Sequence, residues 1–234
     1  MFDPRTHIAR ANPSVSLDWD SIRTVLLDMD GTLLDLHYDN YFWRTFVPER
    51  YAEKHGLPVE EATRLLIDRF RREEGTLNWT DIDYWSAELG LDIPMLKEQV
   101  HHLIEVQPYV VPFLKFVRSR GILTVIVTDA HGKTLDIKMR KTEIGDYFDH
   151  IVSAHDLGAR KYQAEFWKAL REKFHYDGDS TLLVDDKEDV LASAQAYGIR
   201  HLIHVGKPSS REPHAPSERF RSIAYFNELF PHEG

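Results

Sequence analysis

The sequence predicts an α/β protein with a doubly wound parallel sheet and a helical segment inserted after the first strand. Three observations lead to this fold class. Short runs rich in Val, Ile and Leu, with few alternating polar residues, are typical of strands covered on both faces. Segments with apolar residues at helical spacing separate the later runs, which indicates right-handed βαβ units. A long stretch without a clear strand follows the first run.

The predicted sheet has five strands, each a short apolar run. They cover residues 25–28, 123–128, 150–153, 181–184 and 201–205. The helices predicted among the later strands cover residues 112–120, 135–141, 164–174 and 188–197. Gly121 and Gly198 end the first and last of these helices. We expect the strand order 5-4-1-2-3, with ligands bound beyond the carboxyl ends of the strands.

The stretch between the first two strands shows helical spacing only. Its predicted helices cover residues 40–55, 60–73, 80–90 and 94–104. We therefore expect a core of residues 1–36 and 107–234, with an inserted helical domain of residues 37–106. The Pro- and Ser-rich tail after Gly206 is predicted to be a loop, and residues 222–230 are expected to pack back against the core.

The composition excludes several classes of function. The chain has 234 residues, with 29 basic against 38 acidic residues and a formal charge of −9, so it is a poor candidate for coating nucleic acids or anionic membranes. It contains no cysteine, which excludes disulfides, thiolate metal sites and cysteine nucleophiles. We see no apolar signal segment at the start, and no apolar run approaches the ~18 residues of a membrane span. We expect a soluble cytoplasmic protein with no membrane or nucleic acid polymer as partner.

The strongest chemical signal is a pair of aspartates, Asp28 and Asp30, at the end of the first strand. Gly31 and Thr32 follow them. Two carboxylates at this place can collect a divalent cation, and one of them can act as a nucleophile on phosphorus. Gly31 allows a sharp turn that brings backbone amides to an anion. An ordinary acidic turn is the alternative, and three further signals argue against it.

These further signals lie at or near the ends of later elements. Thr128 and Asp129 follow one another at the end of the second strand, where a hydroxyl and free amides can bind phosphate oxygens. Lys161 precedes a helix and would offset negative charge at an aspartate–phosphate site, although a solvated surface lysine has the same signature. Asp185 and Asp186 end another strand, where they would repel each other without a shared cation or would simply complement a helix dipole.

In this order and on these elements, the four signals resemble the motifs of the haloacid dehalogenase-like (HAD) phosphohydrolases. Asp28 and Asp30 match the Asp-x-Asp-Gly-Thr motif, Thr128 the second motif, Lys161 the third, and Asp185 with Asp186 the acidic fourth. The helical insertion matches a type-1 cap in this superfamily. Such a cap is expected to close over the site, with hinges at about residues 34–38 and 105–109.

The resemblance narrows further in the cap. Residues 35–43, 76–79, 83–85 and 153–155 look like the bacterial GMP/IMP nucleotidase branch. This likeness implies a small phosphomonoester as the partner, namely a purine nucleoside 5′-monophosphate, and it leaves the oligomeric state open. A purine base could stack on an aromatic residue of the cap, although helix packing explains their spacing too. The candidates are Tyr41, Phe42, Trp43, Trp79, Tyr84 and Trp85.

The resemblance also implies a mechanism. Asp28 attacks the phosphoryl group to form an aspartyl-phosphate, and Asp30 protonates the leaving oxygen and then activates the hydrolytic water. Mg²⁺ is the implied cofactor, held by Asp28, the backbone carbonyl of Asp30, Asp186, and Asp185 either directly or through water. The implied phosphate-binding residues are Thr128, Asp129 through its backbone, and Lys161.

Three residues depart from the pattern of this branch. Asp129 stands where Asn is expected, Arg160 stands where Pro is expected, and Lys187 replaces a small residue. A carboxylate aimed at phosphate would be unfavourable, so the Asp129 side chain is expected to point away. The two added positive charges are expected to offset it.

Other functions stay open on the same residues. A sugar-phosphate or broad small-molecule phosphatase, or a phosphoglucomutase-type phosphotransferase, would use the same two aspartates. A dehalogenase is disfavoured because that branch lacks the second aspartate, Asp30. A signalling receiver also uses acidic strand ends with a Thr and a Lys, but it is about half this length and orders its acids differently. A catalytically retired scaffold would bind ligands without releasing phosphate.

Overall fold

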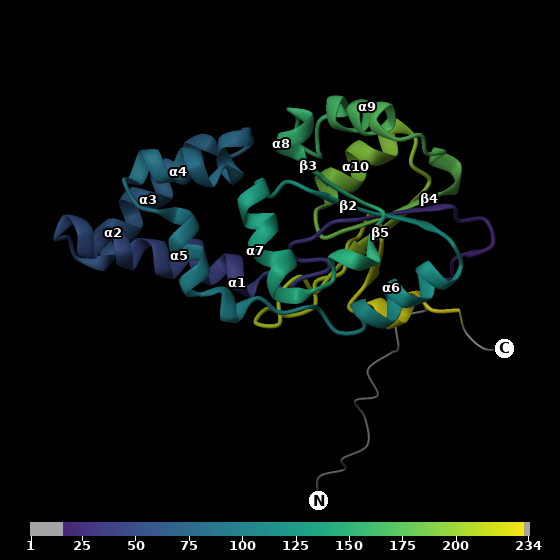
Figure 1. The fold of residues 1–234 in the computed structure, drawn as a ribbon, viewed down its shortest axis with the longest axis horizontal. Coiled ribbons are helices and arrows are strands. Elements are labelled where there is room, and N and C mark those ends of the chain that lie inside the picture. Colours follow the sequence, from purple (N-terminus) through teal and green to yellow (C-terminus); the bar gives the residue numbers. More distant parts are fainter. Residues whose placement is uncertain (1–15, 232–234) are drawn as a thin grey trace, which may run out of the picture.

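The computed structural model describes residues 16–231 of the chain, and its centre is a six-stranded, fully parallel sheet (Figure 1). The strands are β1 (Thr24–Leu27), β2 (Leu123–Thr128), β3 (His150–Ser153), β4 (Thr181–Asp185), β5 (His201–Val205) and β6 (Arg221–Ile223). They lie in the order β3-β2-β1-β4-β5-β6. This confirms the predicted α/β class and five-strand order, and it adds a sixth strand beside β5.

The register of the sheet explains why motifs far apart in the sequence converge. β1 lies between β2 and β4, with Leu27 opposite Ile126 on one side and Val184 on the other. The backbone N–H of Asp28 then donates to the carbonyl of Val184 at 3.0 Å. Because all strands run in parallel, the residues that follow β1, β2 and β4 meet at one edge of the sheet.

Helices cover both faces of the sheet. α9 (Ala164–Lys173) and α10 (Glu188–Tyr197) lie on one side, together with the short α8 (Ala154–Leu157), and α6 (Val110–Ser119) lies on the other (Figure 1). Successive β1 residues point to opposite faces, so Leu26 joins the core under α9 and α10 while Leu27 joins the core that includes Phe113 of α6. The sheet is therefore buried on both faces, as its non-alternating sequence predicts.

The insertion between β1 and β2 is entirely helical, which confirms the prediction. It contains α1 (His37–Tyr41), a π-helical turn (Phe42–Phe46), α2 (Val47–His55), α3 (Val59–Glu73), α4 (Ile82–Leu89) and α5 (Ile93–Gln99), with 3₁₀ turns at Leu77–Thr80 and His101–Leu103. Asp81 caps α4 by accepting the N–H groups of Asp83 and Tyr84. α7 (Gly132–Thr142), the first core helix after β2, packs against α5 beside this insertion.

The two connections between sheet and insertion lie against each other. The N–H of Asp35 donates to Glu105 and that of Gln107 donates to Leu33, each at 2.9 Å. The loop before β6 holds this crossing, because the N–H of Ser210 donates to both carboxylate oxygens of Asp35 at 3.1 Å. Asp35, Glu105 and Gln107 belong to the predicted hinge segments, whereas Leu33 and Ser210 lie outside them.

The predicted tail element is a strand followed by a 3₁₀ turn, Phe226–Leu229. Its residue Phe226 packs on Phe113 of α6, with ring centroids 4.8 Å apart. The predicted core and cap boundaries stay a prediction, and residues 1–15 and 232–234 of that core lie outside the described part of the chain. Among residues 16–231, every helix is too short or too polar to span a bilayer.

Candidate active site

Three aspartates meet at the carboxyl edge of the sheet. Asp28 directly follows β1, Asp185 ends β4, and Asp186 comes next in the chain. One carboxylate oxygen from each lies within 4.8 Å of the others. The three residues are only 5%, 0% and 8% exposed, respectively. Carboxylates this close and this buried repel one another unless positive charge is placed among them.

Lys161 supplies one such charge from the core. Its Nζ lies 2.5 Å from Oδ1 of Asp28 and 2.7 Å from Oδ2 of Asp185, and the residue is 2% exposed. The solvated-surface alternative for Lys161 is therefore wrong. One ammonium group joins the first and fourth motifs in a buried ion-pair cluster, where low dielectric strengthens the attraction.

Burial dominates the acidity of this cluster. It raises the pKa of Asp28 to about 7, although the Lys161 ammonium works in the opposite direction. It likewise raises the pKa values of Asp185 and Asp186 to about 6, opposed by Lys161 and Lys187 respectively. Burial alone would lower the pKa of Lys161, but Asp185 and Asp28 outweigh it and raise that pKa. The carboxylates therefore still lack positive charge at neutral pH.

The oxygen atoms fit a hard divalent cation. Oδ2 of Asp28 is buried and has no hydrogen-bond partner among the described residues. Oδ2 of Asp186 lies 2.9 Å from Nζ of Lys187, outside hydrogen-bonding geometry. Gly31 gives the site its room, because a Cβ there would lie 2.7 Å from this Asp186 oxygen, and its φ of +89° also favours glycine. Converging carboxylate oxygens of this kind suit a divalent metal.

Asp30 lies beside this cluster but its carboxylate has another partner. Nζ of Lys138, on α7, lies 2.6 Å from Oδ1 of Asp30. The same Nζ lies 2.6 Å from Oδ2 of Asp39 on α1. Burial raises the pKa of Asp30, and the Lys138 ammonium opposes that rise. Lys138 and Asp39 are not among the site residues that the sequence predicts. The only available signal was a lysine on the apolar face of an amphipathic helix, one position after Ile137.

The second motif is held by its neighbours. Thr128 is buried at the end of β2, and its Oγ1 accepts the N–H of Ala130 at 3.1 Å. Both carboxylate oxygens of Asp129 are occupied: Oδ2 lies 2.9 Å from Nη2 of Arg160, and Oδ1 accepts the N–H of Lys161 at 3.2 Å. The positive charge of Arg160 thus neutralises the unexpected aspartate.

Most cap aromatics serve packing. Phe42 and Trp85 are fully buried in the insertion. Trp85 packs edge-on against Phe70, with ring centroids 4.9 Å apart. The hydroxyl of Tyr84 donates to Glu73 at 2.9 Å. Helix packing therefore explains these positions, whereas Trp79 is exposed.

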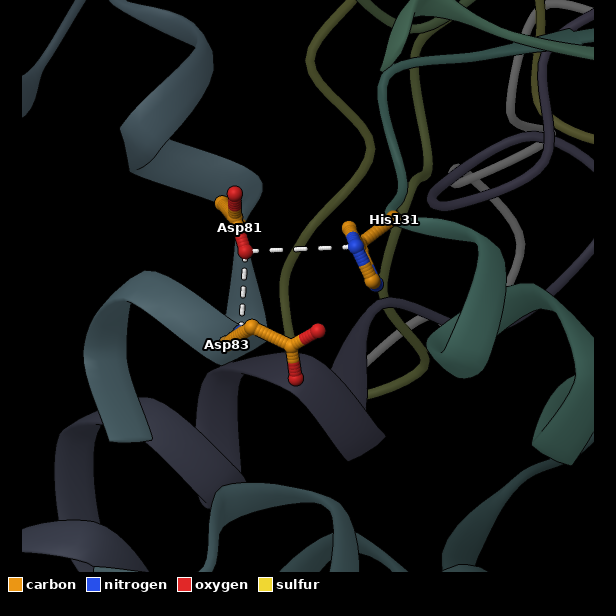
Figure 2. Close-up of side chains that lie close together, drawn as sticks. All are labelled: Asp81, Asp83 and His131. Atoms are coloured by element: carbon orange, nitrogen blue, oxygen red, sulfur yellow. Dashed lines mark hydrogen bonds and ion pairs between the residues drawn. The ribbon is translucent and has the colours of Figure 1, made fainter. Parts of the chain in front are cut away.

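A second acidic group lies where the insertion meets α7 (Figure 2). Asp81 and Asp83 of the insertion face His131, and Nε2 of His131 is 3.9 Å from Oδ1 of Asp81. Asp81 already caps α4, and Nζ of Lys133 lies 2.7 and 2.8 Å from the two oxygens of Asp83. Lys133 therefore balances the charge of Asp83, backbone N–H groups bind Asp81, and the group joins the insertion to the core.

Known proteins are similar to this chain in sequence. A family model described as haloacid dehalogenase-like hydrolase matches residues 22–198. A GMP/IMP nucleotidase, YrfG of Escherichia coli (strain K12), is 34% identical over 217 residues, which is 93% of this chain and 98% of that protein. A phosphorylated carbohydrates phosphatase of Thermotoga maritima is 23% identical, over 80% of this chain and 89% of that protein.

A solved structure shows the same fold. The crystal structure of a HAD phosphatase from Thermococcus onnurineus aligns with a TM-score of 0.76 and 21% identity, covering 88% of this chain and 95% of that one. The family match spans β1 to β4, the insertion and all four motifs of the candidate site. The chain therefore belongs to the haloacid dehalogenase-like hydrolases.

Proposed function

We propose that this protein is a Mg²⁺-dependent phosphatase that hydrolyses purine nucleoside 5′-monophosphates, GMP and IMP, through an aspartyl-phosphate. One observation carries the chemistry: the buried cluster of Asp28, Lys161, Asp185 and Asp186 joins a nucleophile to a cation and to metal-binding oxygens. The substrate class is supported by the 34% identity with a GMP/IMP nucleotidase along nearly the full length of both chains.

Asp28 is the proposed nucleophile. Its Oδ1 is held by Lys161, and its Oδ2 has no hydrogen-bond partner among the described residues. A carboxylate fixed at one oxygen keeps the other in a defined direction for attack on phosphorus. Lys161, Thr128 and the backbone of Asp129 are the proposed phosphate ligands, and the Lys161 ammonium offsets charge on the transferred group.

The metal would be held by Asp28, Asp186 and the backbone carbonyl of Asp30, with Asp185 binding directly or through water. Mg²⁺ there would neutralise the carboxylates and the substrate phosphate, so that two anions can approach each other. Asp30 is the proposed acid and base: it donates a proton to the leaving oxygen, and its carboxylate then takes one from the hydrolytic water.

The proposed nucleophile and the lysine beside it are nearly inaccessible to solvent in this structure. Asp28 and Lys161 are 5% and 2% exposed. We propose that residues 37–106 act as a cap that moves on the segments 34–38 and 105–109 to admit substrate. Closure then excludes bulk water from the aspartyl-phosphate.

A sugar-phosphate or broad phosphomonoester phosphatase is the second candidate. The likeness to a phosphorylated carbohydrates phosphatase favours it, at the lower identity of 23%. A phosphoglucomutase-type transfer would use the same two aspartates. These alternatives share the nucleophile and differ only in the acceptor or in the substrate's alcohol portion.

Phosphate release from a panel of phosphomonoesters tests the proposal. The panel contains GMP, IMP, AMP, pyrimidine nucleotides and sugar phosphates, each with Mg²⁺ and with EDTA. A Mg²⁺-dependent preference for GMP and IMP is expected. Preferred hydrolysis of sugar phosphates would replace the nucleotidase assignment with the second candidate. No release from any compound would contradict a phosphatase and favour a transferase, a receiver or a binding scaffold.

A further inference from the structure

We propose that Lys138 is a positioning residue for Asp30, and that Asp39 of the helical insertion holds Lys138 in place. The inference rests on the proposed phosphatase function, in which Asp30 protonates the leaving oxygen. It adds a requirement that the four sequence motifs do not contain. The acid of the reaction is oriented by a lysine on α7, and a carboxylate of the insertion holds that lysine.

Four charged residues form a continuous row from the core into the insertion. Nζ of Lys138 lies 2.6 Å from Oδ1 of Asp30 and 2.6 Å from Oδ2 of Asp39. Nζ of Lys97, on α5, lies 3.2 Å from Oδ1 of Asp39. The charges alternate along this row, so each buried ion has an opposite charge beside it, as a stable arrangement requires.

Both lysines are enclosed. Lys138 and Lys97 are each 1% exposed. Nζ of Lys97 lies 4.4 Å from the ring centroid of Phe42, and Nζ of Lys138 lies 5.4 Å from that of Tyr38, so aromatic faces of the insertion surround the row. Burying two lysines costs free energy of desolvation. Apolar side chains could fill the same space without this cost, so packing alone does not account for the lysines. A role for their charge explains this cost.

The direction of the contact suits a general acid. An acid catalyst must hold its carboxyl group within hydrogen-bond reach of the leaving oxygen. Asp30 lies in the turn after β1, and among the described residues its side-chain hydrogen bond goes to Lys138 through Oδ1 alone. This bond leaves Oδ2 for the substrate. Lys138 would therefore select one orientation of the Asp30 side chain.

The row also links the acid to the insertion. Asp39 lies on α1 and Lys97 on α5, whereas Lys138 lies on α7 of the core. If the insertion moves to admit substrate, Lys138 loses its ion pair with Asp39 and holds the Asp30 carboxylate less firmly. The orientation of the acid is then completed only when the insertion returns.

Leaving-group dependence tests this role. GMP releases a nucleoside, whose 5′-oxygen is a poor leaving group and requires a proton. p-Nitrophenyl phosphate releases a phenolate that leaves readily without one. Lys138→Met is expected to lower kcat for GMP on the order of 10- to 100-fold more than kcat for p-nitrophenyl phosphate, with KM little changed. Asp30→Asn should show the same bias, and the double variant should lose little more than Asp30→Asn alone.

Matched variants guard against simple loss of the fold. Lys141→Met changes an exposed lysine on the same helix and should leave both rates unchanged. Asp39→Asn keeps the side-chain shape but weakens the anchor, so it should give the same bias to a smaller degree. Lys138→Arg keeps the charge and should restore part of the GMP rate. Thermal melting of each variant reports the folded fraction.

The outcomes separate this role from the proposed function. Equal losses on both substrates, or an unchanged GMP rate, would overturn the positioning role while leaving the phosphatase intact. If wild type prefers a sugar phosphate, the comparison is made with that alcohol leaving group, and the nucleotidase assignment alone fails. If wild type hydrolyses no phosphomonoester, the proposed function fails, and the role of Lys138 fails with it.

Discussion

The guanidinium of Arg160 lies against the carboxylate of Asp129, with Nη2 2.9 Å and Nε 3.1 Å from the same oxygen, Oδ2. Each residue departs from the pattern expected from the sequence, and both lie beside the proposed phosphate site. Together they cancel in charge, and Nη1 of Arg160 also donates to the carbonyl of Thr76 in the insertion at 3.1 Å. The pair therefore connects the second motif, the third motif and the insertion.

Breaking this pair should weaken substrate binding. Arg160→Met leaves the Asp129 carboxylate without its partner near the incoming phosphate, and we expect KM to rise about tenfold through repulsion. The double variant Arg160→Met/Asp129→Asn removes the repelling charge and should recover most of that loss. Steady-state kinetics with GMP measure both. A double variant no better than the single one would show that Arg160 acts through some other contact.

Replacing the nucleophile should abolish turnover without unfolding the protein. Asp28→Asn keeps the side-chain shape but removes the attacking carboxylate, so phosphate release should fall on the order of 10³-fold or more. Asp136→Asn, an exposed acid on α7, serves as the control and should retain full activity. Near-wild-type turnover of the purified Asp28→Asn protein would assign the nucleophile to another residue.

Removing Asp186, a proposed metal ligand, should stabilise the metal-free protein at high pH. Burial raises the pKa of Asp186 from its ordinary value of 3.8 to about 6, so its charged form opposes folding. In EDTA at pH 8, Asp186→Asn should therefore be more stable than wild type, by on the order of 1–3 kcal/mol. The difference should shrink as the pH falls through 6 and vanish only well below 3.8, where the group is protonated in both the folded and the unfolded state.

Added Mg²⁺ should reverse this ranking. A cation that binds only the folded state raises its melting temperature, and wild type should gain more than Asp186→Asn. Melting curves at pH 8 with EDTA and with millimolar Mg²⁺ give the comparison. Equal Mg²⁺-dependent shifts in both proteins would argue that Asp186 does not hold the metal.

The crossing of the two connecting segments should contribute to stability. The Asp35 carboxylate accepts the N–H groups of His37 at 2.8 Å and of Ser210 at 3.1 Å. Asp35→Ala leaves these donors without that acceptor and should cost about 2 kcal/mol in the free energy of unfolding. Asp68→Ala, an exposed acid on α3, should change it by less than about 0.5 kcal/mol. Urea denaturation compares the two, and equal values would deny Asp35 this structural role.

The sequence alone was sufficient for five of the six strands of the sheet and for the four motifs. Buried parallel strands can be recognised from local sequence, since both faces need apolar residues. The strands at residues 123–128, 150–153 and 201–205 were predicted with the bounds that the structure has. β6 escaped prediction because its three residues, Arg-Ser-Ile, are too few to form a pattern. It pairs only because β5 offers an open edge.

The motif residues were predictable because each follows a strand directly or stands near one. Once the strands are parallel, the location of Asp28, Thr128 and Asp185 at one edge of the sheet follows from the topology. No local sequence pattern predicts the contacts of Lys138 with Asp30 and Asp39. A lysine on an amphipathic helix is usually solvated, and the only sign near position 138 is its place on the apolar face beside Ile137. Its burial is decided by the packing of α1 and α5 of the insertion against α7, which brings two distant carboxylates to one ammonium group.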